Sequence, residues 1–375
     1  MKIAILTNII PTYRKDFYER IFENQEHEIT VFCQESIPSS NLKSIHENFI
    51  DHVSLVKFYA PFNNDSLVFH FLPFVKLWKD YDLLVVDGNL RHITQALLAT
   101  IFKLFGKKIV VWSNVYSADG NPILQYIRRS WWLIFDNFLM YTEKDVEILR
   151  KQKFHSKNLV AINNGLNQDE IDEIREKWNP SLLLEVKKKY SITTDSIIIS
   201  SGRVNKVNNH LLALNALKIV QNKIPDIIWV IIGGGTEIEF LKNQAKEKGF
   251  EKNIIFLGEI YNEKEKAPWF LLSKILVHPG YMGLTIFNSF GYSLPVITHD
   301  NLKNHSPEVY LFEENKTGFL FKENDEKDLA EKIIFALNNK EILENMKNFT
   351  YNIAKYKNNT DIMSKQFLKM ISSIN

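Results

Sequence analysis

Residues 278–300 read HPGYMGLTIFNSFGYSLPVITHD, and this stretch decides the fold class. A short apolar strand ends at His278, a loop with two glycines follows, and a helix then leads to a second strand at Pro295–His299. A strand, a glycine loop, a helix and another strand in close succession are typical of α/β folds with a parallel sheet. The C-terminal half of the chain is therefore predicted to be an α/β domain.

The start of the helix in this stretch has the features of an anion site. The backbone N–H groups of Gly283, Leu284 and Thr285 would lie at the helix N-terminus, where they have no partner within the helix. The helix dipole also favours negative charge at this end. We therefore expect Gly280 and the three residues at the helix start to border a phosphate-binding loop.

The same alternation of strands and helices runs along the whole chain. Strands are predicted at Lys2–Thr7, Glu28–Cys33, Asp82–Val86, Lys108–Trp112, Asp136–Tyr141, Leu159–Ile162, Ser196–Ser200, Ile227–Ile232, Asn253–Leu257, Ile275–His278 and Pro295–His299. Residues 165–195 are charged and lack a strand signal. We expect two Rossmann-like domains facing each other across a cleft, at residues 1–180 and 181–355, with a C-terminal helix at 356–375 packing back on the first. Ligands of such sheets bind outside the carboxyl ends of the strands.

Composition limits the class of function. The 46 basic and 44 acidic residues give a net charge of +2, which argues against a nucleic-acid-binding protein. The single cysteine, Cys33, excludes internal disulfides and a cysteine-rich metal site. The N-terminus lacks the apolar region of a signal peptide, and no apolar stretch reaches the roughly 18 residues that span a bilayer. A cytoplasmic protein is expected.

Two further glycine turns follow predicted strands. Gly202 precedes Arg203, whose guanidinium can pair with a diphosphate, and Lys206 stands three residues on. A second strand runs into Gly233, Gly234 and Gly235 before a helix. The alternative for both is a plain strand-to-helix turn, and the sequence leaves it open.

With these motifs, the chain resembles the retaining GT-B glycosyltransferases of family 4, also called group 1. The supporting segments are Gly283-Leu284-Thr285-Ile286, Gly291–Ile297, Pro307-Glu308, Lys316–Leu320, Gly202-Arg203 with Asn209–Leu212, Ile232–Gly235, Asn163–Leu166 and Ile9–Arg14. They extend over nearly the whole chain. The resemblance implies a C-terminal domain that binds a nucleoside-diphosphate sugar and an N-terminal domain that binds the acceptor.

The resemblance also assigns roles to individual residues. Arg203 and Lys206 would stabilise the diphosphate, and Asn288 would hold the ribose. The family's usual Glu-x7-Glu pair falls on Gly280 and Asn288, so the chain resembles a divergent branch that lacks both carboxylates. His299 and Glu308 are the polar residues best placed to contact the donor sugar instead, with a loop hydrogen bond as the alternative for each.

On the acceptor side, the resemblance points to Tyr13 and Arg14 in the first loop of the N-terminal domain. Asn114 stands where the family carries a histidine, and His92 is a candidate to replace that histidine. A helix-cap role is the alternative for His92. No residue cluster has metal-ligand spacing, so neither a metal nor a cofactor is expected. Asp80-Tyr81-Asp82 spells a metal motif but precedes its strand, so a role at the strand entry is favoured.

The predicted function is transfer of a sugar from a UDP- or GDP-sugar to a glycan or lipid-linked acceptor in surface polysaccharide or lipopolysaccharide synthesis. Two alternatives remain: a degraded subunit that binds carbohydrate or a partner transferase, and a nucleotide-sugar epimerase. Lys107-Lys108 and Arg128–Leu133 place cations beside aromatic residues. A helix with a buried aromatic face is favoured there, and peripheral contact with the inner face of the plasma membrane stays open.

Overall fold

The computed structural model describes residues 1–37, 42–62, 66–115 and 121–374. The chain divides into two compact units, and each is described by itself. Unit 1 comprises Met1–Asn167 and Asn359–Asn375, and unit 2 comprises Gln168–Asn358. The sequence-based boundary at 180 lies 13 residues after this division, and the boundary at 355 lies 3 residues before it. The C-terminal helix α14 (Thr360–Ser372) is part of unit 1.

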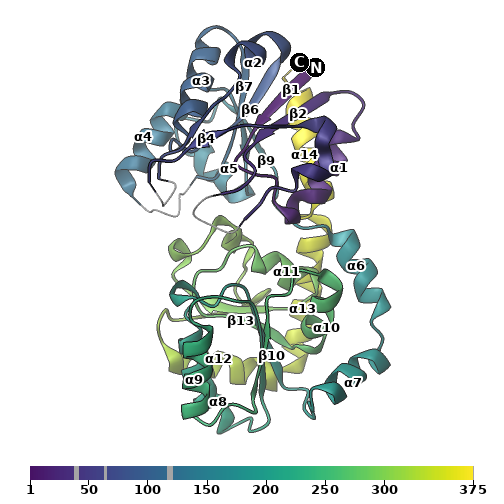
Figure 1. Cartoon of the computed structure of the whole chain (residues 1–375). Helices are drawn as coiled ribbons and strands as arrows, with labels where there is room; N and C mark the ends of the chain where they lie inside the picture. Colours follow the sequence, from purple (N-terminus) through teal and green to yellow (C-terminus); the bar gives the residue numbers. More distant parts are fainter. Residues whose placement is uncertain (38–41, 63–65, 116–120, 375) are drawn as a thin grey trace. The chain divides into compact units, whose positions relative to one another are not determined.

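Unit 1 is built on a seven-stranded parallel sheet of order β3-β2-β1-β6-β7-β8-β9 (Figure 1). Its strands are β1 (Lys2–Leu6), β2 (Glu28–Cys33), β3 (Val53–Leu55), β6 (Leu83–Asp87), β7 (Lys108–Ser113), β8 (Asn137–Met140) and β9 (Asn158–Ala161). A short antiparallel pair, β4 (Phe58–Tyr59) and β5 (Phe69–His70), lies outside this sheet.

Alternating side chains of these strands build two cores, because successive residues of a strand point to opposite faces. On one face Ile3 and Ile5 pack with helices α1 (Lys15–Phe22) and α14. On the other face Ala4 and Leu6 belong to a core completed by four helices. These helices are α2 (Phe74–Asp80), α3 (Ile93–Leu104), α4 (Pro122–Trp132) and α5 (Glu143–Arg150). Helices on both faces explain why the strands read as continuous apolar runs.

Unit 2 has a six-stranded parallel sheet of order β12-β11-β10-β13-β14-β15. Its strands are β10 (Ile197–Ser201), β11 (Ile228–Ile232), β12 (Ile254–Gly258), β13 (Ile275–His278), β14 (Val296–His299) and β15 (Gly318–Phe321). Its helices are α6 (Gln168–Lys177), α7 (Pro180–Lys189), α8 (His210–Gln221), α9 (Ile238–Glu247), α10 (Glu263–Leu272), α11 (Thr285–Gly291), α12 (Glu326–Asn338) and α13 (Lys340–Tyr356). The predicted α/β fold with two parallel sheets is confirmed.

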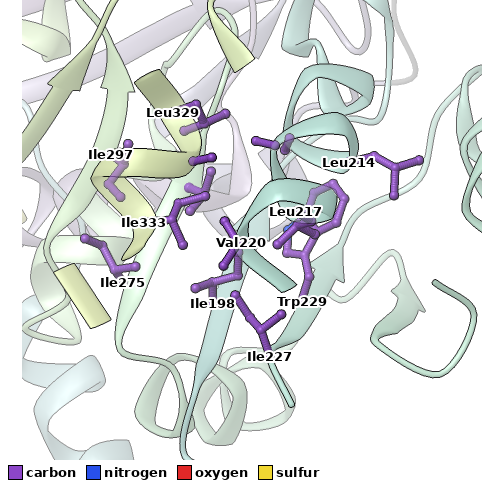
Figure 2. Packing of buried hydrophobic residues seen from close by; sticks show 14 of the residues in the cluster. Ile198, Leu214, Leu217, Val220, Ile227, Trp229, Ile275, Ile297, Leu329 and Ile333 are labelled. Carbon is purple, nitrogen blue, oxygen red and sulfur yellow. The ribbon is translucent and has the colours of Figure 1, made fainter. Parts of the chain in front are cut away.

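Figure 2 shows the main core of unit 2, in which Trp229 of β11 lies beside Leu217 of α8, and Ile333 of α12 belongs to the same cluster. The direction of winding of the sheet reverses beside β10, because β11 and β12 lie on one side of it and β13 to β15 on the other. In open α/β sheets such a reversal opens a crevice at the carboxyl ends of the strands. The candidate site of unit 2 lies there.

Residues 165–195, which lack a strand signal, contain no strand and hold helices α6 and α7. Helix α11 begins at Thr285, as the glycine loop before it predicts. One helix start differs from the prediction: the helix expected directly after Gly235, at Thr236, begins at Ile238 and has no side-chain cap.

Candidate functional site

The loops after β10 and β11 are held together backbone to backbone. The Gly202 N–H donates to the Ile232 carbonyl at 2.9 Å, and the Val204 N–H donates to the Gly234 carbonyl at 2.8 Å. A Cβ atom on Gly233 would lie 1.8 Å from the Gly202 carbonyl oxygen, and one on Gly235 would lie 2.3 Å from the Val204 oxygen. These two glycines are therefore required by the close approach of the two loops.

The loop after β13 packs against the loop after β10 in the same way. A Cβ on Gly280 would lie 2.1 Å from the Val207 carbonyl oxygen, to which the Tyr281 N–H donates at 3.2 Å. Gly202 and Gly283 differ from Gly280, because a Cβ on either would meet only side-chain atoms at 3.5 Å or more. Backbone at these two glycines is open to the approach of a ligand.

Helix α11 starts directly at this loop. The Thr285 hydroxyl donates to the Ser201 carbonyl at 2.9 Å, which ties the helix start to the end of β10. Among the described residues, the N–H groups of Gly283 and Leu284 have no hydrogen-bond acceptor. The helix start thus offers donors beside the loop of Gly202.

Arg203 and Lys206 supply positive charge in the same loop region. Both are exposed, and neither side chain forms a hydrogen bond or ion pair with the described residues. Asn208 donates from Nδ2 to the Arg203 carbonyl at 2.6 Å. Asn208 therefore supports the loop of Arg203 instead of adding a cation.

A pair of stacked histidines lies next to the glycine loop and holds its backbone by hydrogen bonds. His299, at the end of β14, stacks on His305 with ring centroids 3.8 Å apart. His305 accepts a hydrogen bond at Nδ1 from the Met282 N–H at 3.0 Å and donates from Nε2 to the His299 carbonyl at 3.2 Å. Both ring nitrogens are thus engaged, which fixes the neutral tautomer and holds the 279–283 backbone.

Glu308 is connected to the same loop through Ser306. Its carboxylate is buried and accepts a hydrogen bond from the Ser306 hydroxyl. The Ser306 N–H donates to the Met282 carbonyl at 3.0 Å. The structure therefore brings His299 and Glu308 close to the glycine loop through His305 and Ser306. Sequence reasoning missed His305, because a histidine in a loop without a pattern carries no signal of its own.

Burial keeps His305 and also His278, the last residue of β13, neutral at physiological pH. It lowers the pKa of His278 to about 4, and with the neighbouring His299 it lowers the pKa of His305 to about 4. A histidine with a lower pKa in the folded chain binds a proton more tightly when unfolded. Its contribution to stability is complete above the ordinary pKa of about 6.5 and is lost as the pH falls towards 4.

We predict that the free energy of unfolding decreases by about 1–2 kcal/mol for each of these two histidines between pH 7 and pH 5. Urea unfolding at the two pH values measures this change. The variant His305→Gln should show a smaller decrease than the wild type, whereas replacement of the exposed His155 by glutamine should leave the decrease unchanged. An equal decrease in wild type and His305→Gln would contradict the assignment.

Asn288 lies on α11, one turn beyond the helix start. Its Oδ1 atom is buried and has no hydrogen-bond partner among the described residues. A buried acceptor without a donor is rare in folded proteins and costs free energy. Asn288 Oδ1 is thus a buried acceptor that lacks a donor among the described residues.

Unit 1 has a pocket of its own, with a volume of about 250 Å³, at the carboxyl ends of β1, β6 and β7. Tyr13 and Arg14 line it. Arg14 is buried, and its guanidinium lies 5.4 Å from the ring centroid of Trp112 and 5.8 Å from that of Tyr141. These contacts hold the cation without a carboxylate partner among the described residues.

Two neutral polar atoms of this pocket also lack a partner. Asn8 Oδ1 and Trp112 Nε1 are buried without a hydrogen bond to the described residues. The residues that line this pocket thus include a buried acceptor and a buried donor without partners in the described part of the chain.

His92 and Asn114 are not part of the pocket lining. His92 is buried at the N-cap position of α3, and α3 has no side-chain cap hydrogen bond. The Nε2 atom of His92 lies 3.6 Å from the carboxylate of Asp87, a residue that does line the pocket. Asn114 is half-buried directly after β7.

The acidic motif before β6 has a structural role. Asp80 ends α2, and the Asp82 carboxylate accepts a hydrogen bond from the Lys2 N–H at 2.7 Å, next to the start of the strand. Among residues 1–37, 42–62, 66–115 and 121–374, no three His, Cys, Asp or Glu side chains are grouped so that they could hold a metal ion.

Comparison with known proteins identifies the class. The family model described as glycosyl transferases group 1 matches residues 184–353, which include every candidate site residue of unit 2. Residues 184–353 form a group 1 glycosyltransferase domain. The chain is 24% identical over 266 residues to an uncharacterized glycosyltransferase of Haemophilus influenzae, a match that covers 69% of this chain and 67% of the relative.

Solved structures extend the likeness of this glycosyltransferase to the whole chain. Alr3699/HepE of Anabaena in complex with UDP matches with a TM-score of 0.72 and 13% identity, over 100% of both chains. The lipopolysaccharide outer core galactosyltransferase WaaB matches with a TM-score of 0.66 and 14% identity, also over 100% of both chains. The fold is that of the GT-B glycosyltransferases, as predicted.

Proposed function

We propose that unit 2 of this glycosyltransferase binds a nucleoside-diphosphate sugar at the carboxyl ends of β10, β11 and β13. The observation that carries the proposal is the pair of unpaired cations, Arg203 and Lys206, beside the open N–H groups of Gly283 and Leu284. Cations and free N–H groups together favour a diphosphate. The matched Anabaena structure holds UDP, which supports a uridine or related nucleotide as the ligand class.

We propose that the sugar passes with retention to a glycan or lipid-linked acceptor in surface polysaccharide or lipopolysaccharide synthesis. Asn8, Tyr13, Arg14 and Trp112 of the unit 1 pocket offer hydrogen bonds and aromatic faces for an acceptor sugar. The likeness to WaaB supports a lipopolysaccharide or related acceptor. Peripheral contact with the inner face of the plasma membrane would bring the enzyme to a lipid-linked acceptor.

In this proposal no protein nucleophile is needed, because the leaving diphosphate takes the proton of the acceptor hydroxyl. The bond from the anomeric carbon to the diphosphate oxygen breaks, and the bond to the acceptor oxygen forms on the same face. Arg203 and Lys206 would stabilise the charge that develops on the diphosphate, so we propose that neither a metal nor a cofactor is required.

Incubation of the purified protein with UDP-, GDP- and ADP-sugars tests this function. We expect slow release of the free sugar from one donor in the absence of acceptor. Binding of a nucleotide without any donor turnover would favour the degraded subunit. Conversion of a donor into its epimer without sugar release would favour the epimerase.

Replacement of Asn288 by alanine tests the contact to the ribose. We expect a three- to tenfold lower affinity for UDP, because about 1 kcal/mol is the usual contribution of one hydrogen bond. The same variant should bind 2′,3′-dideoxy-UDP as the wild type does, since this analogue lacks both ribose hydroxyls. Calorimetric titration of both proteins with both ligands measures the difference. An equal loss for both ligands would exclude the ribose contact.

A further inference from the structure

Helix α4 of unit 1 is amphipathic in the reverse sense. Its buried face carries Gln125, Arg128 and Trp132. Its exposed face carries apolar side chains, namely Ile123 (69% exposed), Leu124 (56%), Tyr126 (72%) and Ile127 (48%). Helices of soluble proteins turn their apolar stripe towards the core. The exposed face of α4 is therefore suited to an apolar or interfacial environment.

The buried face of α4 is fully explained by structure. Trp132 Nε1 donates to the Gly88 carbonyl at 3.0 Å, and the Arg128 guanidinium donates to the Val115 carbonyl and lies over the Trp132 ring. The contacts of Arg128 and Trp132 thus agree with the predicted helix that has a buried aromatic face. It does not account for the four apolar residues on the opposite side.

Helix α3 continues this apolar surface. Leu97, Ile101 and Leu104 share one side of the helix at a spacing of four and three residues, and Phe105 follows them. Leu104 and Phe105 are each 74% exposed. Trp131, in the last turn of α4, donates from Nε1 to the Thr100 hydroxyl at 2.8 Å, which makes α3 and α4 neighbours.

Helix α2 borders the same surface through Trp78. Its ring meets the rings of Phe102 and Phe105 edge-on, with centroids 5.0 and 6.2 Å apart. Trp78 and Val75 are both exposed. In Figure 1 the three helices, drawn in blue, cover one side of unit 1. We call the exposed apolar residues of α2, α3 and α4, together with Phe105, the apolar face. Such a contiguous area is unusual on a monomeric protein and marks an interaction site.

The helices of the apolar face carry more basic than acidic residues, although Lys103 of α3 is paired with Asp136 and Asp82 lies near Trp78 and Lys107. Helices α3 and α4 contain no acidic residue, and α2 contains one, Asp80, at its end. Lys107 donates to the carbonyls of Trp78 and Tyr81, and Arg129 donates to Gln125 and Gln152, so no carboxylate compensates either cation in these contacts. A second copy of this face would bring like charges together.

We propose that the apolar face docks the enzyme on the surface of an anionic lipid bilayer. The apolar side chains would enter the interface, and Lys107, Lys108 and Arg129 would lie at the level of the anionic headgroups. No helix among the described residues is both long and apolar enough to cross a membrane. This proposal names the membrane partner and does not depend on the nucleotide site.

Flotation of the full-length protein with lipid vesicles tests the proposal in the absence of nucleotide. We expect binding to phosphatidylglycerol–phosphatidylcholine vesicles and weaker binding to pure phosphatidylcholine. The double variant Leu104→Glu/Tyr126→Glu should lose affinity for anionic vesicles by about tenfold or more, because two inserted side chains become charged. The variant Lys108→Gln/Arg129→Gln should lose about tenfold on anionic vesicles alone.

The matched control is Phe349→Glu/Tyr356→Glu on α13 of unit 2, where both replaced residues are also exposed. It should bind vesicles as the wild type does. Far-UV circular dichroism and calorimetric UDP binding verify that the variants are folded. A wild type that stays unbound with anionic vesicles would overturn the proposal, as would a control that loses the same affinity. Dimerisation without lipid that only Leu104→Glu/Tyr126→Glu abolishes would assign the face to a second copy instead.

Discussion

The variant Arg203→Ala is expected to bind UDP about 10- to 100-fold more weakly than the wild type. A charge-assisted hydrogen bond to a ligand contributes about 1.5–3 kcal/mol. The Arg203 side chain is exposed beside Gly202 and has no hydrogen bond or ion pair with the described residues, so its removal should not disturb the fold. Calorimetric titration measures the change in affinity.

The control for this prediction is Arg150→Ala, which removes an exposed arginine at the end of α5 in unit 1. It should leave UDP affinity unchanged. If Arg203→Ala bound UDP as tightly as the wild type does, Arg203 would not contact the diphosphate. If both variants weakened binding alike, a general effect of net charge would explain the result.

The second large effect is expected from Gly233→Ala, on stability. Its Cβ would lie 1.8 Å from the Gly202 carbonyl oxygen, and Gly233 has a φ of +147°. This clash is with a backbone atom, which cannot move aside as the end of a flexible side chain can. The loops after β10 and β11 must therefore separate. We expect a decrease of about 2–5 kcal/mol in the free energy of unfolding, from backbone strain and overpacking together. Urea unfolding measures it.

Gly249→Ala separates the two causes. Gly249 also has a positive φ, of +77°, but a Cβ there would meet no atom within 4 Å. This variant should lose only about 1 kcal/mol from backbone strain. Equal losses for Gly233→Ala and Gly249→Ala would show that the contact between the two loops is unimportant.

The fold could be predicted because its signals are local. Apolar strands, glycine turns and helical spacing recur in both halves, and short-range patterns of this kind dictate a parallel sheet. The position of α11 was also accessible, since glycine, leucine and threonine follow a strand within a few residues. Helix α7 buries no residue and therefore lacks a clear apolar stripe, whereas α6 buries Ile171 and Ile174 at helical spacing, a signal that the sequence does contain.

The contacts within the site were less predictable, because they join residues far apart in the sequence. Nothing local indicates that Gly233 packs on Gly202, or that His305 holds Met282. The reverse amphipathicity of α4 was equally hidden, since the sequence gives its apolar residues without saying which side is buried. Roles that depend on tertiary contacts thus require the structure.

The central claim is that unit 2 binds a nucleoside diphosphate at Gly202, Arg203 and the start of α11. Calorimetric titration of the full-length wild-type protein with UDP, GDP and ADP tests it most directly. The account predicts saturable binding of one of the three nucleotides at a single site. The absence of binding by all three would contradict it.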